Sequence, residues 1–196
     1  MDGNGSIKDR RVQRTQQLLE AALLSLIKEK EFDLITVQEI IDRANVGRAT
    51  FYAHYENKED LIESGFEGLL ATLRERQRET RGQSGNIDEQ LFAFSRHLLA
   101  HANEHRDIFP SMVSKRGGAL IQHLLRHLLV KVVRDDVKAM MPKGGQVPEE
   151  AVVQFIAGGL FGLIMWWLSG KRRLSVEEVD GLFRRLALPA IKAVAS

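Results

Sequence analysis

An arginine, a threonine, two tyrosines, a histidine and a lysine lie within the eleven positions from Arg48 to Lys58, directly after Gly47. Most of these side chains donate hydrogen bonds to anions or to flat polar edges. Phosphate oxygens and nucleic-acid base edges are partners of this kind. The segment is therefore a candidate nucleic-acid-binding surface, and its use depends on the elements that hold it.

Apolar residues recur three and four positions apart along almost the whole chain, a spacing that is typical of amphipathic helices. No segment shows the alternation of a strand series, so we expect an all-α protein of about nine helices. The expected helices span residues 11–31, 36–43, 48–54, 57–80, 88–104, 106–114, 118–141, 148–169 and 176–194.

The helices over 36–43 and 48–54, with the short connection between them, have the dimensions of a helix-turn-helix. Thr36 and Glu39 form the pattern of a capping box at the start of the first helix. Gly47 is expected to give the backbone the freedom to turn between the two helices. In such a unit the second helix lies in the major groove of DNA, and its first residues meet the base edges.

Arg48 stands at the start of that second helix, and its guanidinium group matches the O6/N7 edge of guanine. Thr50 and Tyr52 share one face and can reach a phosphate, a thymine methyl group or a base edge. The side chains with donors suited to phosphate oxygens are His54, Lys58 and Thr36. We expect Arg48→Ala to relax base discrimination, and Lys58→Ala to weaken binding to all sequences alike and to flatten its salt dependence.

The distribution of charge gives a mixed signal for nucleic-acid binding. Residues 1–60 carry 9 Lys/Arg and 11 Asp/Glu, a balance of −2, whereas a DNA-binding surface is expected to be basic. The segment 43–58 alone has Arg43, Arg48 and Lys58 against Glu56, a local balance of +2. Hydroxyl and backbone N–H groups also bind phosphates without formal charge. For Arg10, Arg11 and Arg14 two interpretations remain open: they form an arm that contacts the DNA, or they belong to a solvated tail.

From Thr36 to Leu61 the order T-x-x-x-I-I-x-x-A-x-V-x-x-x-T-F-Y-x-H-Y-x-x-K-x-x-L closely resembles the tetracycline-repressor (TetR) family, over about residues 11–65. The resemblance implies an all-α homodimer with an N-terminal three-helix DNA-binding domain and a larger C-terminal domain that binds a small molecule. It also implies that ligand binding moves the helix over 57–80 and lowers operator affinity. The DNA contacts that it implies are Thr36, Arg48, Ala49, Thr50, Tyr52, His54 and Lys58. The family often has Gly or Ser at Arg48, so guanine readout there is our inference from residue type.

The linker RGQSGN (81–86) marks the expected domain boundary, because glycine and serine favour irregular connections. We expect a DNA-binding domain over 1–56, with 1–9 as a flexible arm. A connecting helix over 57–80 and an effector-binding and dimerisation domain over 81–196 complete the chain.

The run AVVQFIAGGLFGLIMWWL (151–168) is interrupted only by Gln154 and approaches the length of a membrane-spanning helix. A helix that is apolar all round is equally suited to burial in protein. Gly158 and Gly162 leave a groove for another helix, and the run resembles the family helix that forms a four-helix dimer interface with the last helix. We favour core and dimer over a membrane anchor. The expected interface residues are Gly158, Gly162, Leu182, Phe183 and Leu186.

The resemblance also implies an effector pocket in the C-terminal domain. Pockets of this kind are mostly apolar with a few polar anchors, which suggests a small organic effector. The aromatic and soft apolar residues expected to line it are Phe92, Phe109, Met112, Leu124, Phe155, Met165 and Trp166.

Histidines recur at helical spacing in two places, and imidazoles four residues apart can ligate one zinc or nickel ion. His97, His101 and His105 form one such row, and His123 and His127 form another. The row at 97–105 also resembles an ordinary helix junction of the family. We therefore expect no metal, with a metal-responsive regulator as the alternative.

Several classes of protein are disfavoured by composition and motifs. There is no cysteine, which excludes disulfides and thiolate chemistry and fits a reducing cytoplasm. The N-terminus lacks the apolar core of a signal peptide. Phosphate-binding glycine loops, H-E-x-x-H and nucleophile elbows are absent from the sequence, so we expect neither an enzyme nor a cofactor. The expected function is a dimeric repressor that binds a palindromic double-stranded DNA operator and is released by a small effector; activation stays open.

Overall fold

The computed structural model describes residues 3–83, 85–109, 118–141, 146–170 and 174–195. These residues contain helices and no strand, so the all-α expectation is confirmed. The helices are α1 (Gly3–Ile27), η1 (Phe32–Leu34, a 3₁₀ turn), α2 (Val37–Ala44), α3 (Arg48–Tyr52), α4 (Lys58–Gln83), α5 (Ile87–Gln90), α6 (Phe94–Glu104), α8 (Gly118–Met140), α9 (Glu149–Ser169) and α10 (Val176–Ala195).

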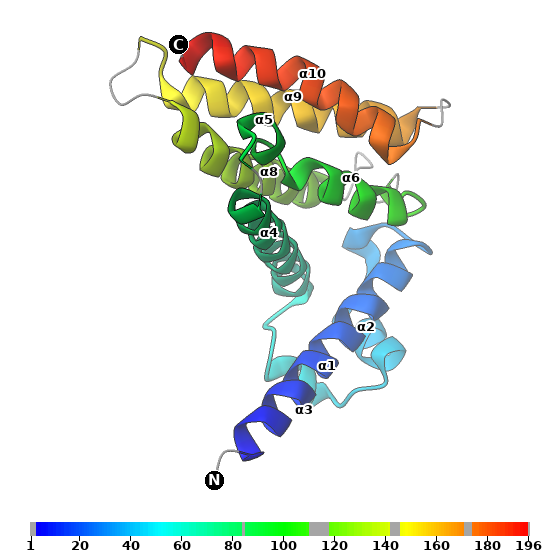
Figure 1. Cartoon of the computed structure of the whole chain (residues 1–196). Coiled ribbons are helices and arrows are strands. Elements are labelled where there is room, and N and C mark those ends of the chain that lie inside the picture. Colours follow the sequence, from blue (N-terminus) through cyan, green and yellow to red (C-terminus); the bar gives the residue numbers. More distant parts are fainter. Residues whose placement is uncertain (1–2, 84, 110–117, 142–145, 171–173, 196) are drawn as a thin grey trace.

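The helices form two groups that α4 connects (Figure 1). The first group contains α1, α2 and α3 and holds the N-terminus. The second contains α5, α6, α8, α9 and α10, with α9 and α10 side by side at the end of the molecule away from α1–α3 (Figure 1). This arrangement leaves one end for α3 and the opposite end for α9 and α10.

Helix α1 begins at Gly3, so residues 3–9, expected as part of a flexible arm, are helical in the structure. The segment 6–27 contains neither proline nor glycine, and nothing in it interrupts the helical backbone. Arg10, Arg11 and Arg14 are exposed on this helix rather than on an extended arm.

The helix expected over 88–104 is divided into α5 and α6 at Phe92, which adopts a left-handed backbone conformation with φ of 58°. Its buried N–H group donates a 2.9 Å hydrogen bond to Asp136 Oδ2 on α8. The break lets Leu91, Phe92 and Phe94 all face the core, where none is more than 2% exposed. A distant carboxylate therefore ends a helix that the local spacing continues.

The expected helix over 106–114 falls partly on residues 110–117, which lie outside the described structure, and Met112 is among them. Of its first residues, Ile108 and Phe109 are buried.

Two apolar cores correspond to the two groups of helices. The core of α1–α4 is built on Leu23, Ile40 and Phe51 and also receives Ile108 and Ile121 from the C-terminal half. A second core fills the space between α4, α6, α8, α9 and α10. Because residues of the C-terminal half complete the first core, the two domains pack directly on each other.

Among the described residues, α9 is the one helix long and apolar enough to cross a membrane, and 50% of its most apolar window is buried inside the protein. The buried stripe includes Val153, Leu160, Ile164 and Trp167, which belong to the C-terminal core. About half of the residues in this window therefore pack in the core of the C-terminal domain.

Candidate DNA-binding surface and interdomain cavity

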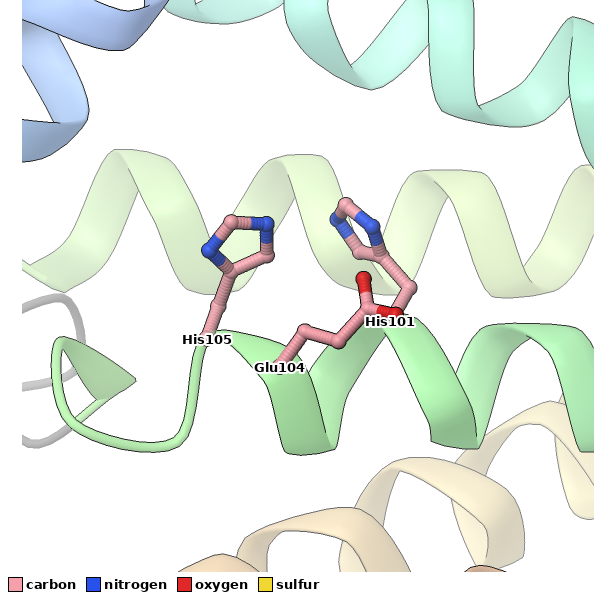
Figure 2. A group of neighbouring side chains, drawn as sticks. All are labelled: His101, Glu104 and His105. Carbon is pink, nitrogen blue, oxygen red and sulfur yellow. The ribbon is translucent and has the colours of Figure 1, made fainter.

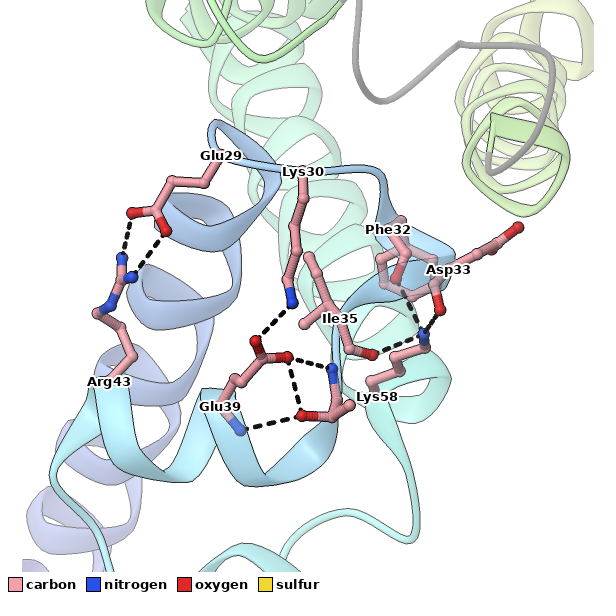
Figure 3. Close-up of polar contacts among 9 residues, drawn as sticks. Glu29, Lys30, Phe32, Asp33, Ile35, Glu39, Arg43 and Lys58 are labelled. Carbon is pink, nitrogen blue, oxygen red and sulfur yellow. Dashed lines mark hydrogen bonds and ion pairs between the residues drawn. The ribbon is translucent and has the colours of Figure 1, made fainter.

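The start of α2 is fixed by a capping box, as the sequence predicts (Figure 3). The Thr36 backbone N–H donates to Glu39 Oε2 at 2.9 Å, and the Glu39 N–H donates to Thr36 Oγ1 at 3.3 Å. Lys30 Nζ lies 2.5 Å from Glu39 Oε1. The hydrogen bonds from Lys30 and then Thr36 to the carboxylate lower the pKa of Glu39 from 4.5 to about 2.

The turn between α2 and α3 is made by Asn45, not by Gly47 as expected. Asn45 is left-handed, with φ of 51° and ψ of 48°, and its N–H group bonds to the carbonyls that end α2. Asparagine accepts this conformation more readily than other residues with a Cβ atom. Gly47 is extended, with φ of −73°, and a Cβ atom there would lie 3.5 Å from Thr50 Oγ1, an ordinary contact.

Helix α3 is held by one aromatic side chain and presents the others. Phe51 is 0% exposed in the N-terminal core, while Arg48, Ala49 and Tyr52 are exposed. The Arg48 guanidinium carbon lies 5.6 Å from the centroid of the Tyr52 ring, a cation–π contact. The remaining expected contacts on this side are half-buried, namely Thr50 and His54.

Gln38, on the first turn of α2, was missed by the sequence reasoning. It is exposed, and its Oε1 lies 3.5 Å from Nη1 of Arg48. Its position two residues after the expected contact Thr36 was the available signal. Gln38, Arg48 and Tyr52 together form what we call the reading surface.

Lys58 lies where its ammonium group supports the protein itself (Figure 3). Nζ donates to the carbonyl oxygens of Phe32, Asp33 and Ile35 at 2.9, 3.0 and 2.8 Å. An ammonium group has three donors, and all three are used here. The expectation of a phosphate contact by Lys58 therefore disagrees with the structure, because its three N–H donors already bind the carbonyl oxygens of η1 and Ile35 and none is left for a phosphate.

Arg43 is likewise engaged, through two hydrogen bonds of 2.8 and 2.9 Å to the Glu29 carboxylate (Figure 3). Of the three basic side chains in 43–58, Arg48 alone forms no ion pair or carbonyl cap within the described residues. The basic charge of this segment is thus concentrated on the reading surface.

A cavity of about 180 Å³ lies between the N-terminal and C-terminal domains. Its wall is almost entirely apolar and comes from α1, α4, α6, α8 and α9 together with Phe109. Three titratable side chains contribute to the wall: Glu20, His101 and His105. Burial raises the pKa of Glu20. The pKa of His101 is lowered mainly by burial and to a smaller extent by the neighbouring His105, so both groups tend toward their neutral forms.

Phe109 is the one expected pocket residue that lines this cavity among the described residues. Phe92 packs in the C-terminal core, with its ring centroid 5.3 Å from that of Phe183. Leu124 packs beside the N-terminal core, and Met165 beside the C-terminal core. Phe155 and Trp166 point outward, being 70% and 51% exposed, because they fall on the stripe of α9 opposite its buried one.

Both halves of the chain match known families. Residues 18–64 match the bacterial regulatory proteins of the tetR family, and residues 89–188 match a transcriptional regulator C-terminal region. The chain belongs to the TetR family. It is accordingly a DNA-binding transcriptional regulator, and neither matching family is one of enzymes.

Individual relatives and structural neighbours cover different shares of the chain. YxbF of Bacillus subtilis, an uncharacterized HTH-type transcriptional regulator, is 46% identical over 66 residues, which are 33% of this chain and 17% of YxbF. A TetR transcriptional regulator from Streptococcus agalactiae is 28% identical with a TM-score of 0.63, covering 94% of this chain and 99% of that one. Thermus thermophilus FadR, a repressor solved with lauroyl-CoA, is 21% identical with a TM-score of 0.63, covering 88% and 93%.

In this TetR-family chain, α9 and α10 carry an exposed apolar surface that we call the terminal face. It consists of Phe155, Gly158, Gly162, Trp166 and Leu186. All five are exposed, Leu186 to 71%, and a Cβ atom at either glycine would meet nothing within 4 Å.

Two of the five expected interface residues are placed elsewhere. Phe183 is only 4% exposed because it packs into the C-terminal core against Phe92, and Leu182 is half-buried beside it on α10. Phe183, expected at the interface, is thus a core residue, and Phe155, expected in the pocket, is exposed on the terminal face. The helix α9 is apolar on every side, so its spacing alone did not reveal which side faces outward.

Proposed function

We propose that this TetR-family protein is a repressor that binds a palindromic operator as a homodimer and is released by a small organic effector. The observation that carries the proposal is the reading surface, whose exposed Arg48 and Tyr52 flank a fully buried Phe51. A recognition helix needs a buried side chain that fixes it to the protein and polar side chains that remain exposed to the DNA.

The proposed DNA contacts follow from position and chemistry. Arg48 donates to the O6/N7 edge of guanine, and Gln38 beside it can donate to and accept from adenine. Ala49 follows Arg48 on α3, and its small exposed side chain allows close approach to a thymine methyl group. Contacts to phosphate come from Thr50, Tyr52 and His54. Thr36 is left out because its hydroxyl and its backbone N–H both donate to Glu39. Lys58 is left out of this set because its ammonium group stabilises η1.

The terminal face supports a homodimer. A patch that combines Phe155, Trp166 and Leu186 with two open glycines offers apolar area and close helix approach to a second copy. It also lies at the opposite end from α3, so two copies joined there leave both reading surfaces free (Figure 1).

The interdomain cavity supports release by an effector. A molecule in it contacts α1 and α4 on one side and α6, α8 and α9 on the other. A ligand shifts a conformational equilibrium only if it binds the two states differently. A molecule that touches both domains meets this condition, and a mostly apolar wall suits an organic compound. The structural neighbour FadR was solved with lauroyl-CoA, which is an organic ligand, and this supports an organic effector for the present protein.

The DNA-binding part is tested by selecting duplexes from a randomised library with the purified full-length protein. We expect an enriched palindrome whose half-site centres are about 34–36 Å apart. Enrichment of no sequence at low salt contradicts the proposal.

The effector part is tested by thermal shift with a panel of acyl-CoA thioesters and small phenols. A compound that raises Tm should lose this effect in Ala102→Trp, which fills the cavity, and keep it in Ala71→Trp, an exposed control on α4. Equal stabilisation of both variants contradicts the cavity as the effector site.

A further inference from the structure

Three potential metal ligands meet at the end of α6, in the order His101-Ala102-Asn103-Glu104-His105. One ligand atom from each of His101, Glu104 and His105 lies within 4.8 Å of the others. Figure 2 shows the two imidazoles side by side, with the Glu104 carboxylate next to the His101 ring. The two ring centroids are 4.6 Å apart.

The arrangement follows from helical geometry. Residues three and four apart lie on the same face of a helix, so positions 101, 104 and 105 converge on one side. The same H-x-x-E-H order places two zinc-binding histidines on one helix in a class of zinc enzymes. Here α6 ends at Glu104, and His105 has left the helical backbone with φ of −102° and ψ of 19°.

The distances fit a site that closes around an ion. Zinc–nitrogen and zinc–oxygen bonds are about 2.0–2.2 Å, so ligand atoms around one ion are roughly 3.4 Å apart. The present separation of up to 4.8 Å therefore has to shrink by up to about 1.4 Å, which is within the reach of side-chain rotation. Glu104 is exposed and is free of the packing that would fix its side chain.

The other histidines lack this convergence. His97, expected in the same row, is exposed and is not one of the three residues of the cluster, whose third member is Glu104. His123 and His127 on α8 are also four residues apart, but their ring centroids are 6.0 Å apart and no third ligand joins them among the described residues.

The location distinguishes this cluster from a chance surface group. His101 and His105 both line the interdomain cavity, and both are half-buried. Three protein ligands leave at least one coordination position for water or another molecule, as in open zinc sites. That position is available to a polar group on a molecule that fills the apolar cavity.

We infer that His101, Glu104 and His105 bind one zinc ion at the wall of the interdomain cavity. Two imidazoles and one carboxylate are a ligand set that suits zinc over magnesium or calcium, which prefer oxygen ligands alone. An ion held there also lies at the interface between the two domains, on which the proposed release by an effector depends. An effect of zinc on DNA binding therefore rests on the proposed function, whereas zinc binding itself does not.

The test is calorimetric titration of zinc chloride alone into the chelator-treated full-length protein, without DNA. We expect one zinc per chain. His101→Ala and His105→Ala should each weaken binding by more than about tenfold, the loss that even an outer partner of a metal ligand causes. The double variant His123→Ala/His127→Ala is the matched control and should bind zinc like the wild type.

Two further measurements distinguish residues that bind the zinc ion from residues that only stabilise the fold. Glu104→Gln replaces an exposed carboxylate with a similar shape, so it should weaken zinc binding without lowering the Tm of the metal-free protein. Anomalous scattering at the zinc edge should place the ion between the two imidazoles. Absence of stoichiometric binding, unchanged affinity in the His101 and His105 variants, or loss of binding in the control overturns the inference.

Discussion

The N-terminal and C-terminal domains use their charged side chains in different ways. In the N-terminal domain the ion pairs are at least partly exposed, and two of them, Lys30–Glu39 and Arg43–Glu29, join segments within that domain. In the C-terminal domain Asp136 is 0% exposed and joins three elements. It accepts hydrogen bonds from Gln77 Nε2 at 3.0 Å, Arg81 Nη2 at 2.6 Å and the Phe92 N–H at 2.9 Å.

This difference shows how each domain obtains its function. The core of the N-terminal domain comes mainly from α1–α4, and the exposed side chains of the reading surface are available for the proposed DNA contacts. The C-terminal domain is fastened by contacts between segments far apart in the chain, such as Ser95 with Asp180. A cavity can form between such segments because no continuous stretch of chain has to fill it.

The largest expected effect concerns the terminal face. Trp166→Glu or Leu186→Glu places a charge in the proposed interface and should convert the dimer to monomers in analytical ultracentrifugation. Because a monomer holds only one half-site, operator affinity should fall by about 10²–10⁴-fold. Ile87→Glu, a comparably exposed apolar position on α5, is the control and should remain dimeric. A dimeric Trp166→Glu protein would place the interface elsewhere.

The next effect concerns the buried carboxylate. Asp136→Ala removes the acceptor of three donors, two of which, on Gln77 and Phe92, are buried, and should lower the free energy of unfolding by about 3–5 kcal/mol. Urea denaturation followed by circular dichroism measures this. Asp135→Ala breaks only the half-exposed pair with Arg74 and should cost about 1 kcal/mol or less. Equal losses would mean that the burial of Asp136 does not make its contacts more important than those of the half-exposed Asp135.

Lys58→Met sharpens the comparison within the N-terminal domain. It removes three hydrogen bonds from an ammonium group to carbonyl oxygens, and we expect a loss of about 1–3 kcal/mol in unfolding free energy. Lys28→Met breaks an exposed pair with Asp107 and should cost less. If Lys58→Met kept full stability and flattened the salt dependence of operator binding, Lys58 would be a phosphate contact after all.

The smallest effect concerns the exposed capping box. The pKa of Glu39 is lowered from 4.5 to about 2 in the folded protein, so its ionised form stabilises the fold above pH 4.5. That contribution is lost as pH falls from 4.5 through about 2. Glu39→Gln should therefore have a lower Tm than the wild type at pH 6, and the gap should close near pH 2. A gap that is independent of pH would assign the stabilisation to something other than the carboxylate charge.

The sequence predicted what depends on near neighbours. The capping box joins Thr36 and Glu39, three positions apart, and Arg48 and Tyr52 of the reading surface lie on one short helix, so spacing and residue type were sufficient for them. The turn was misassigned because both Asn45 and Gly47 can accept a left-handed backbone, and the choice depends on how α3 packs.

The cavity and the outer side of α9 were beyond prediction for a physical reason. Phe92 ends a helix because of Asp136, 44 residues away, and no local pattern records that contact. Phe155 and Phe183 are equally apolar, and only the packing of α9 on α8 and α10 decides that one is exposed and the other buried. His101 and His105 were noticed by spacing, but their position at the cavity depends on the approach of α1 and α4.

The most direct test of the account is the base preference of Arg48→Ala, measured by binding to every single-base variant of the selected operator. Arg48 is the exposed side chain proposed to read guanine, so its loss should remove about 1–3 kcal/mol of discrimination at one base pair in each half-site. Lys58→Met should leave the order of base preferences unchanged. A uniform loss of affinity across all operator variants in Arg48→Ala would contradict the role of α3 as the reading helix.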